Sequence, residues 1–135
     1  MINPSLFLRR ALQADAIFSG VSALMLVFGA GLFASLTNLP ETFLRNTGLV
    51  LVVYAALVGF LGTRSMMPKT AVWAVIAVNV IWAIDSFILL VSGWVSPNLL
   101  GEALIVMQAI AVGVFAELQF IGLRKREGAV RPLNA

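Results

Sequence analysis

The chain contains no cysteine and no histidine, and charged side chains make up only 11% of its 135 residues. Without cysteine and histidine it cannot form disulfides, carry out thiol chemistry, or build His-ligated haem sites and the usual zinc sites. The charged fraction is less than half of the roughly 25% that is typical of soluble domains. The sequence also shows no phosphate-binding loop and no nucleophile with an adjacent base. It therefore predicts no metal and no cofactor, and it gives no indication of an enzyme.

Hydrophobic residues make up 61% of the chain and are concentrated in four long runs. Each run provides about the 20 apolar residues that a helix needs to cross a hydrocarbon core of roughly 30 Å. The sequence therefore predicts an all-α integral membrane four-helix bundle, in which residues 1–135 form a single transmembrane domain. The expected spans are residues 12–36, 44–63, 71–91 and 99–123, followed by a mobile basic tail over residues 124–135.

Basic residues divide unequally between the two ends of these spans. Eight of them fall on the side that carries both termini, and only Arg45 falls on the other. The eight are Arg9, Arg10, Arg64, Lys69, Arg124, Lys125, Arg126 and Arg131. The positive-inside rule then places both termini in the cytoplasm, an N-in/C-in topology. Because the basic residues form short clusters at span ends, we expect the lipid bilayer, not nucleic acid, as their partner.

Small residues recur along the second span at a spacing suited to helix packing. At 100° per residue, Gly48, Ala55, Gly59 and Gly62 lie within about 40° of one line along the helix. Lipid supplies little hydrophobic force between helices, so close backbone approach at small residues must hold a bundle together. We expect this stripe to face another helix.

Polar residues inside the spans form two expected layers. Asp15, Ser19 and Glu117 belong to a layer on the cytoplasmic side, where nearby arginines are long enough to reach the carboxylates. The outer layer is the candidate intramembrane polar site. It consists of Asp85, Asn79, Trp82, Ser86, Glu102 and Arg45. Since Arg45 is the only cation near that level, at least one outer acid is expected to be protonated, to lie at the interface, or to await a ligand.

Two interpretations of these acidic residues stay open. Ionisable groups at membrane depth are costly, and they often mark a proton, ion or ligand route. They can instead hydrogen-bond between helices and fix the packing. The packing role is the favoured interpretation for Asp15, Glu102 and Glu117, whereas the two interpretations are balanced for Asp85, the acid closest to the middle of the membrane.

Four segments of the chain resemble those of small four-helix proteins of the bacterial inner membrane. These segments are RRALQADAIFSG, LPETFLRNTG, AVNVIWAIDS and AELQFIGLRKRE. The resemblance is one of layout, covers most of the chain, and implies a multi-pass protein of the inner (plasma) membrane, without an assigned activity. The chain lacks the glycine-rich, asparagine-containing pattern of small fluoride channels. It also lacks the early intramembrane glutamate of small multidrug transporters.

The leading functional hypothesis is a bundle without enzymatic activity. It acts either as an accessory or assembly partner of another membrane subunit, or as a binder of a small hydrophobic ligand. The alternative is a homo-oligomeric conduit or transporter that uses Asp85 and Glu117 as proton or cation sites, because four short helices rarely enclose a pathway alone. A membrane enzyme ranks third, since no paired catalytic groups are present.

Overall fold

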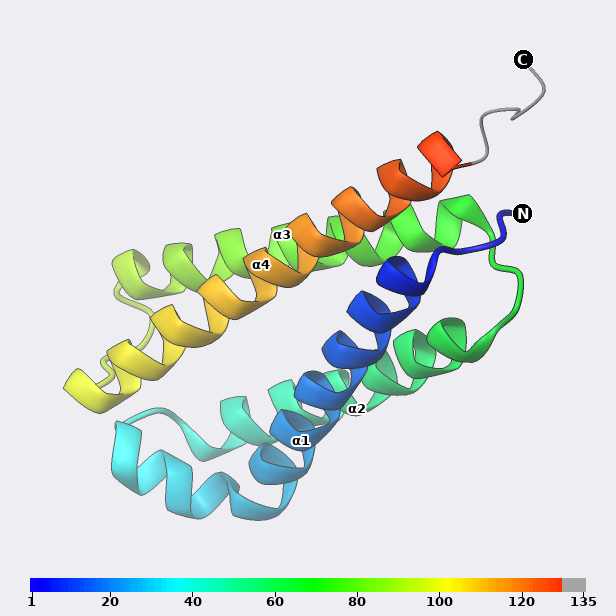
Figure 1. The fold of residues 1–135 in the computed structure, drawn as a ribbon. Coiled ribbons are helices and arrows are strands. Elements are labelled where there is room, and N and C mark those ends of the chain that lie inside the picture. Colours follow the sequence, from blue (N-terminus) through cyan, green and yellow to red (C-terminus); the bar gives the residue numbers. More distant parts are fainter. Residues whose placement is uncertain (130–135) are drawn as a thin grey trace.

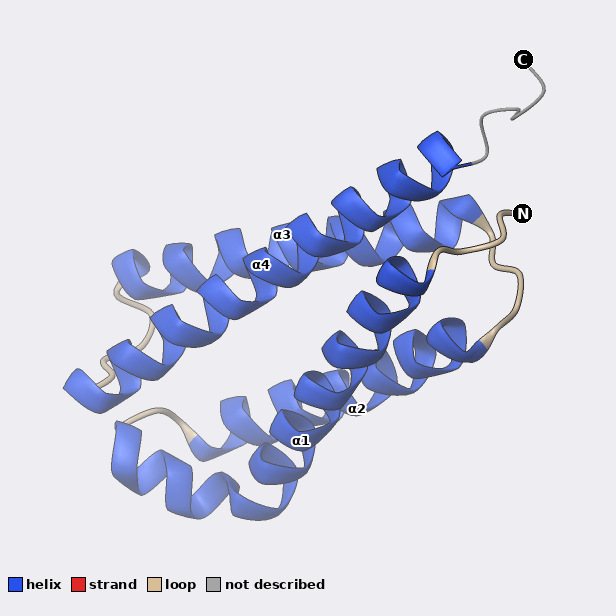
Figure 2. Cartoon of the chain, in the orientation of Figure 1, coloured by secondary structure: helices blue, strands red, loops and turns tan. Residues whose placement is uncertain are grey.

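The computed structural model describes residues 1–129, with side chains to residue 125, and these residues form four helices in an up-down-up-down order. The helices are α1 (Leu6–Thr37), α2 (Glu41–Thr63), α3 (Lys69–Ser92) and α4 (Leu99–Ala129). Short loops join them (Figure 2). Within the described residues, the all-α four-helix prediction is confirmed.

Local sequence explains most helix boundaries. The Ser5 hydroxyl accepts a hydrogen bond from the Leu8 backbone N–H at 3.1 Å and so caps the start of α1. Asn38, in a left-handed conformation, ends α1, and Gly93 ends α3 in the same way. Proline precedes the first residue of both α2 and α3, where its missing N–H costs no helical hydrogen bond.

The expected mobile tail over residues 124–135 begins inside α4, and its mobility stays a prediction. Helix α4 continues through residues 124–129 instead of ending at Leu123, because nothing in that stretch breaks a helix before Gly128. The rest of the expected mobile tail, residues 130–135, lies outside the described residues.

The helices form two hairpins, α1 with α2 and α3 with α4, which contact each other mainly where α1 meets α4 (Figure 1). The α1–α2 contact is close. A Cβ placed on Gly48 would lie 2.9 Å from the Leu26 Cβ, and one on Gly62 would lie 3.2 Å from the Gln13 Cγ. Gly59 also faces α1. The expected small-residue stripe of α2 therefore lies against α1, with Ala55 opposite Gly20.

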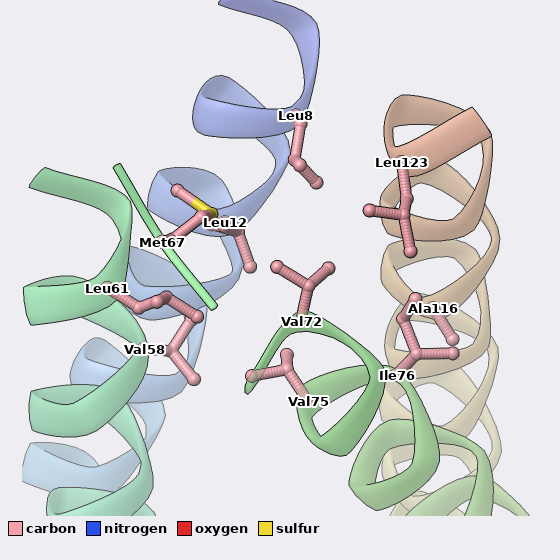
Figure 3. Packing of buried hydrophobic residues seen from close by; sticks show 10 residues of the cluster. All are labelled: Leu8, Leu12, Val58, Leu61, Met67, Val72, Val75, Ile76, Ala116 and Leu123. Atoms are coloured by element: carbon pink, nitrogen blue, oxygen red, sulfur yellow. The ribbon is translucent and has the colours of Figure 1, made fainter. Parts of the chain in front are cut away.

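At the end of the bundle where α1 begins and α4 ends, the hairpins share a hydrophobic cluster (Figure 3). Leu8 and Leu12 of α1 meet Val72 of α3 and Leu123 of α4, and all four side chains are fully or almost fully buried. The backbones of Ile2 and Met67 exchange two hydrogen bonds beside this cluster. These contacts hold the hairpins together at this end, called here the inner end.

The two loops at the opposite, outer end hold the hairpins together a second time. The Asn98 backbone N–H donates to the Thr37 carbonyl at 2.9 Å, and its side-chain amide donates to the Leu36 carbonyl at 2.7 Å. The Asn38 amide donates to the Ser96 carbonyl at 2.6 Å.

Helix α1 bends at Gly29, whose backbone leaves the helical conformation (Figure 1).

The outward faces of the helices are apolar. Phe28 on α1 and Val91 on α3 are 83% and 84% exposed, and every helix carries large hydrophobic side chains that are exposed. Within the described residues, the helices α1 to α4 are all long and apolar enough to cross a membrane. Even α2, with 23 residues, extends for about 35 Å at 1.5 Å per residue.

Candidate functional site

Asp15 lies at the centre of a buried hydrogen-bond network to which every helix contributes a side chain. Its Oδ2 accepts from the Asn79 amide at 3.0 Å and from the Gln119 amide at 2.7 Å. Its Oδ1 accepts from the Ser19 hydroxyl at 3.2 Å. The Tyr54 hydroxyl lies 2.6 Å from Asp15 Oδ2 and 2.9 Å from Asn79 Oδ1, so its single proton is donated to one oxygen at a time.

In this network, called here the Asp15 network, the acid itself is buried. Asp15 is 1% exposed and Gln119 is fully buried. Asn79 also donates to Gln119 Oε1 at 3.0 Å, which ties α3 to α4. The partners of Asp15 are all neutral side chains, so the network joins the two hairpins without an ion pair.

A second group of hydrogen bonds joins α3 to α4 further toward the outer end. The Trp82 indole N–H donates to Gln108 Oε1 at 2.9 Å. The Gln108 amide donates to the Ser86 hydroxyl at 2.9 Å, and that hydroxyl donates to the Trp82 carbonyl at 2.8 Å. The Trp82 ring is thereby held against α4 by Gln108 Oε1, while the amide nitrogen of the same side chain binds Ser86 one turn further along α3.

A cavity of about 860 Å³ occupies the space between the Asp15 network and the outer loops. Helices α2 and α3 both line it but do not form an extensive contact with each other, so the cavity lies where the hairpins diverge. Tyr54 and Asn79 belong to its lining near the network, and Trp82, Asp85 and Ser86 form part of the α3 wall. Most of the remaining lining residues are aliphatic or aromatic. The volume is within the range of roughly 300–1,000 Å³ that is usual for small-molecule sites.

The expected inner layer is only partly assembled. Asp15 and Ser19 are hydrogen-bonded to each other, but Glu117 is exposed and takes no part in the network. No arginine among residues 1–125 forms an ion pair with Asp15. The described side chains form one ion pair, between Arg45 and Glu41 at 2.7 Å, at the outer end of the bundle.

Two of the arginine side chains at the inner end lie over aromatic rings instead. The guanidinium groups of Arg64 and Arg124 lie 5.3 and 5.6 Å from the ring centres of Phe60 and Phe120. Each ring lies four residues before its cation, so both contacts are local ones.

The expected outer site is divided. Asp85, Trp82 and Ser86 all line the cavity, whereas Asn79 hydrogen-bonds to Asp15. Glu102 is exposed in the first turn of α4, where a carboxylate is favoured by the helix dipole. Arg45 pairs with Glu41 one turn earlier on α2, so it is not the partner of Asp85.

Three residues of the site were absent from the expected set, namely Tyr54, Gln108 and Gln119. Each is a polar side chain in the middle part of an apolar helix, where a hydrogen-bond partner is required. That requirement is visible in the sequence. The identity of each partner depends on how the helices are rotated, which the sequence does not show.

Comparisons of this chain with protein-family models, with curated proteins and with solved structures found no match. The candidate site therefore rests on its own geometry, namely a mainly apolar cavity with a hydrogen-bonded polar floor and one acidic side chain on its wall.

Proposed function

We propose that this chain is an integral protein of a bacterial inner membrane, with both termini in the cytoplasm. The apolar outward faces of the helices support insertion, since soluble proteins rarely expose contiguous apolar surface of this extent. The antiparallel order brings Arg9, Arg64 and Arg124 to the inner end, whereas Arg45 lies near the outer loops. The positive-inside rule then assigns the inner end to the cytoplasm.

Reporter fusions test this topology. A green fluorescent protein fused after Ala135 should fluoresce, and alkaline phosphatase inserted after Asn38 should be active, because phosphatase folds only outside the cytoplasm. Phosphatase inserted after Ser65, in the loop between α2 and α3, serves as the matched control and should be inactive. Active phosphatase at residue 65 with inactive phosphatase at residue 38 would reverse the proposed orientation.

We further propose that the protein binds a small amphiphilic molecule from the bilayer inside this cavity. The observation that carries this function is the cavity itself, about 860 Å³ in volume and bounded by α2 and α3 where the hairpins diverge. In this membrane topology the opening between α2 and α3 faces the lipid, so a ligand could enter sideways. The apolar lining would hold a hydrocarbon tail, and the polar groups of Tyr54, Asn79 and Trp82 would orient a polar head.

The packing contacts that an empty cavity would lose support ligand binding over a purely structural role. Dispersion contacts hold helices together in lipid, and an unfilled cavity of this size forfeits them. Two sets of outer-loop hydrogen bonds and the inner cluster keep the hairpins joined at both ends while α2 and α3 stay apart between them. The cavity therefore forms because the two hairpins are held together at both ends of the bundle but not between α2 and α3.

Photolabelling with a neutral alkyl amphiphile that carries a diazirine tests binding. Saturable labelling is expected at cavity residues such as Val50 and Leu104, and an excess of unlabelled amphiphile should suppress it. Labelling of Phe28, which lies outside the cavity lining and is exposed, should be weak and should not saturate. Equal, unsaturable labelling at all three residues would overturn the proposed function.

A further inference from the structure

The charges around the cavity are all of one sign. Among the described residues, no lysine or arginine belongs to the cavity lining, although the whole chain has nine. Asp85 is the lining residue that carries an acidic side chain. A second carboxyl group, that of Asp15, lies directly behind the lining residues Tyr54 and Asn79 and has no basic partner among the described side chains.

Asp85 is a carboxyl group with unused hydrogen-bonding capacity. Within residues 1–125, whose side chains are described, it forms no hydrogen bond and no ion pair. It lies two turns before the end of α3 at Ser92, which is about 10 Å along the helix axis at 1.5 Å per residue. At that depth an unpaired carboxylate is costly unless a cation or water accompanies it.

Aromatic rings surround the same space. Phe18, Phe33, Phe43, Tyr54, Trp82 and Trp94 line the cavity. Trp94 also lines a smaller hollow of about 280 Å³ together with Asp85. Ring faces attract cations, most strongly when water is excluded, and tryptophan is the best of the three aromatic residues for this contact. Asp85 and Trp94 are both exposed, Trp94 to 85%, so they provide two groups that favour positive charge at the outer edge of the cavity.

We propose that the cavity selects lipophilic monocations, molecules in which a cationic nitrogen or phosphorus is attached to apolar groups. The cationic centre lies near Asp85 and Trp94, and the apolar groups fill the space between α2 and α3. A zwitterionic lipid headgroup fits less well, because its phosphate would enter a lining without lysine or arginine. This inference rests on the proposed function and adds a charge requirement to it.

The test compares two ions of nearly equal size and opposite charge, tetraphenylphosphonium and tetraphenylborate, with the full chain in nanodiscs of neutral lipid. Binding is measured by equilibrium dialysis, and empty nanodiscs supply the background. Saturable binding of the phosphonium is expected. Saturable binding of the borate, with an affinity equal to or above that of the phosphonium, would overturn the proposal.

Substitutions then assign the charge requirement to particular residues. Asp85→Asn should weaken phosphonium binding by about tenfold or more, and Asp85→Glu should restore most of it. Glu117→Gln removes the same charge from an exposed position outside the cavity lining and should leave binding unchanged. Trp94→Leu should weaken binding several-fold, whereas Trp73→Leu, which alters a residue outside the lining, should not.

Two results would contradict the inference at this level. One is equal phosphonium affinity in wild type and Asp85→Asn, and the other is equal loss in Asp85→Asn and Glu117→Gln. Thermal unfolding confirms that each variant is folded before binding is measured. If photolabelling by the neutral amphiphile persists while the phosphonium does not bind, the charge requirement fails and the proposed function stands. If both fail, the proposed function fails as well.

Discussion

Replacing Asp15 by alanine should destabilise the bundle far more than the same change at Asp85. Asp15 accepts hydrogen bonds from Tyr54, Asn79 and Gln119, each on a different helix. Measured hydrogen bonds between transmembrane helices average about 0.6 kcal/mol, so three of them amount to about 2 kcal/mol. Buried amide donors left without a partner at Asn79 and Gln119 add about 1 kcal/mol each at the low end of the usual range.

The expected loss for Asp15→Ala is therefore about 2–4 kcal/mol in the free energy of unfolding. Asp85→Ala removes a side chain that makes no hydrogen bond with a described residue, and it should lower the stability by no more than about 0.5 kcal/mol. Reversible unfolding by dodecyl sulfate in mixed micelles, followed by tryptophan fluorescence, measures both. Equal losses for the two variants, or a loss below about 0.5 kcal/mol for Asp15→Ala, would refute the structural role of the Asp15 network.

Further predictions concern helix packing and the outer loops. Gly48→Ala should destabilise by about 1–3 kcal/mol, because the new Cβ would lie 2.9 Å from the Leu26 Cβ. The control Gly113→Ala, where the new Cβ would lie more than 4 Å from any described side chain or neighbouring helix, should be neutral or stabilising in the same unfolding assay. Asn98→Ala removes the side-chain bond to the Leu36 carbonyl and should increase hydrogen exchange in both outer loops, and unchanged exchange would contradict this. Tyr54→Phe should lower the free energy of unfolding by about 0.5–1.5 kcal/mol, whereas an unaltered stability would show that its hydroxyl contributes nothing to the network.

The sequence is sufficient to predict the fold class, because the fold class depends mainly on the length of the apolar runs. Long apolar runs separated by Pro40, Pro68 and Pro97 define helices whose length matches a bilayer, and no partner needs to be known for that inference. The α2 stripe of small residues follows from helix periodicity in the same way. The end of α4 does not coincide with the end of the expected span, because the change from apolar to basic residues at Arg124 ends the hydrophobic run without ending the helix.

The site was harder to predict, because it depends on how two hairpins meet. Depth along a helix follows from residue spacing, so Asp15 and Asp85 were placed at different levels of the bundle from the sequence alone. Rotation about the helix axis decides partners, and it turned Asn79 toward Asp15 and left Asp85 on the cavity wall. Arginines were expected near Asp15 because they lie at the cytoplasmic ends of the spans and are long enough to reach it, yet neutral side chains from the other helices bind it instead.

The central claim is that the space between α2 and α3 is a binding cavity for a bilayer amphiphile. Val50 and Val53 provide the most direct measurement, since both lie on α2 and are 56% and 60% exposed, but only Val50 lines the cavity. Val50→Trp should fill the cavity and abolish saturable photolabelling of Leu104 by the neutral amphiphile, and Val53→Trp should leave that labelling intact. Equal labelling in both variants would contradict the account.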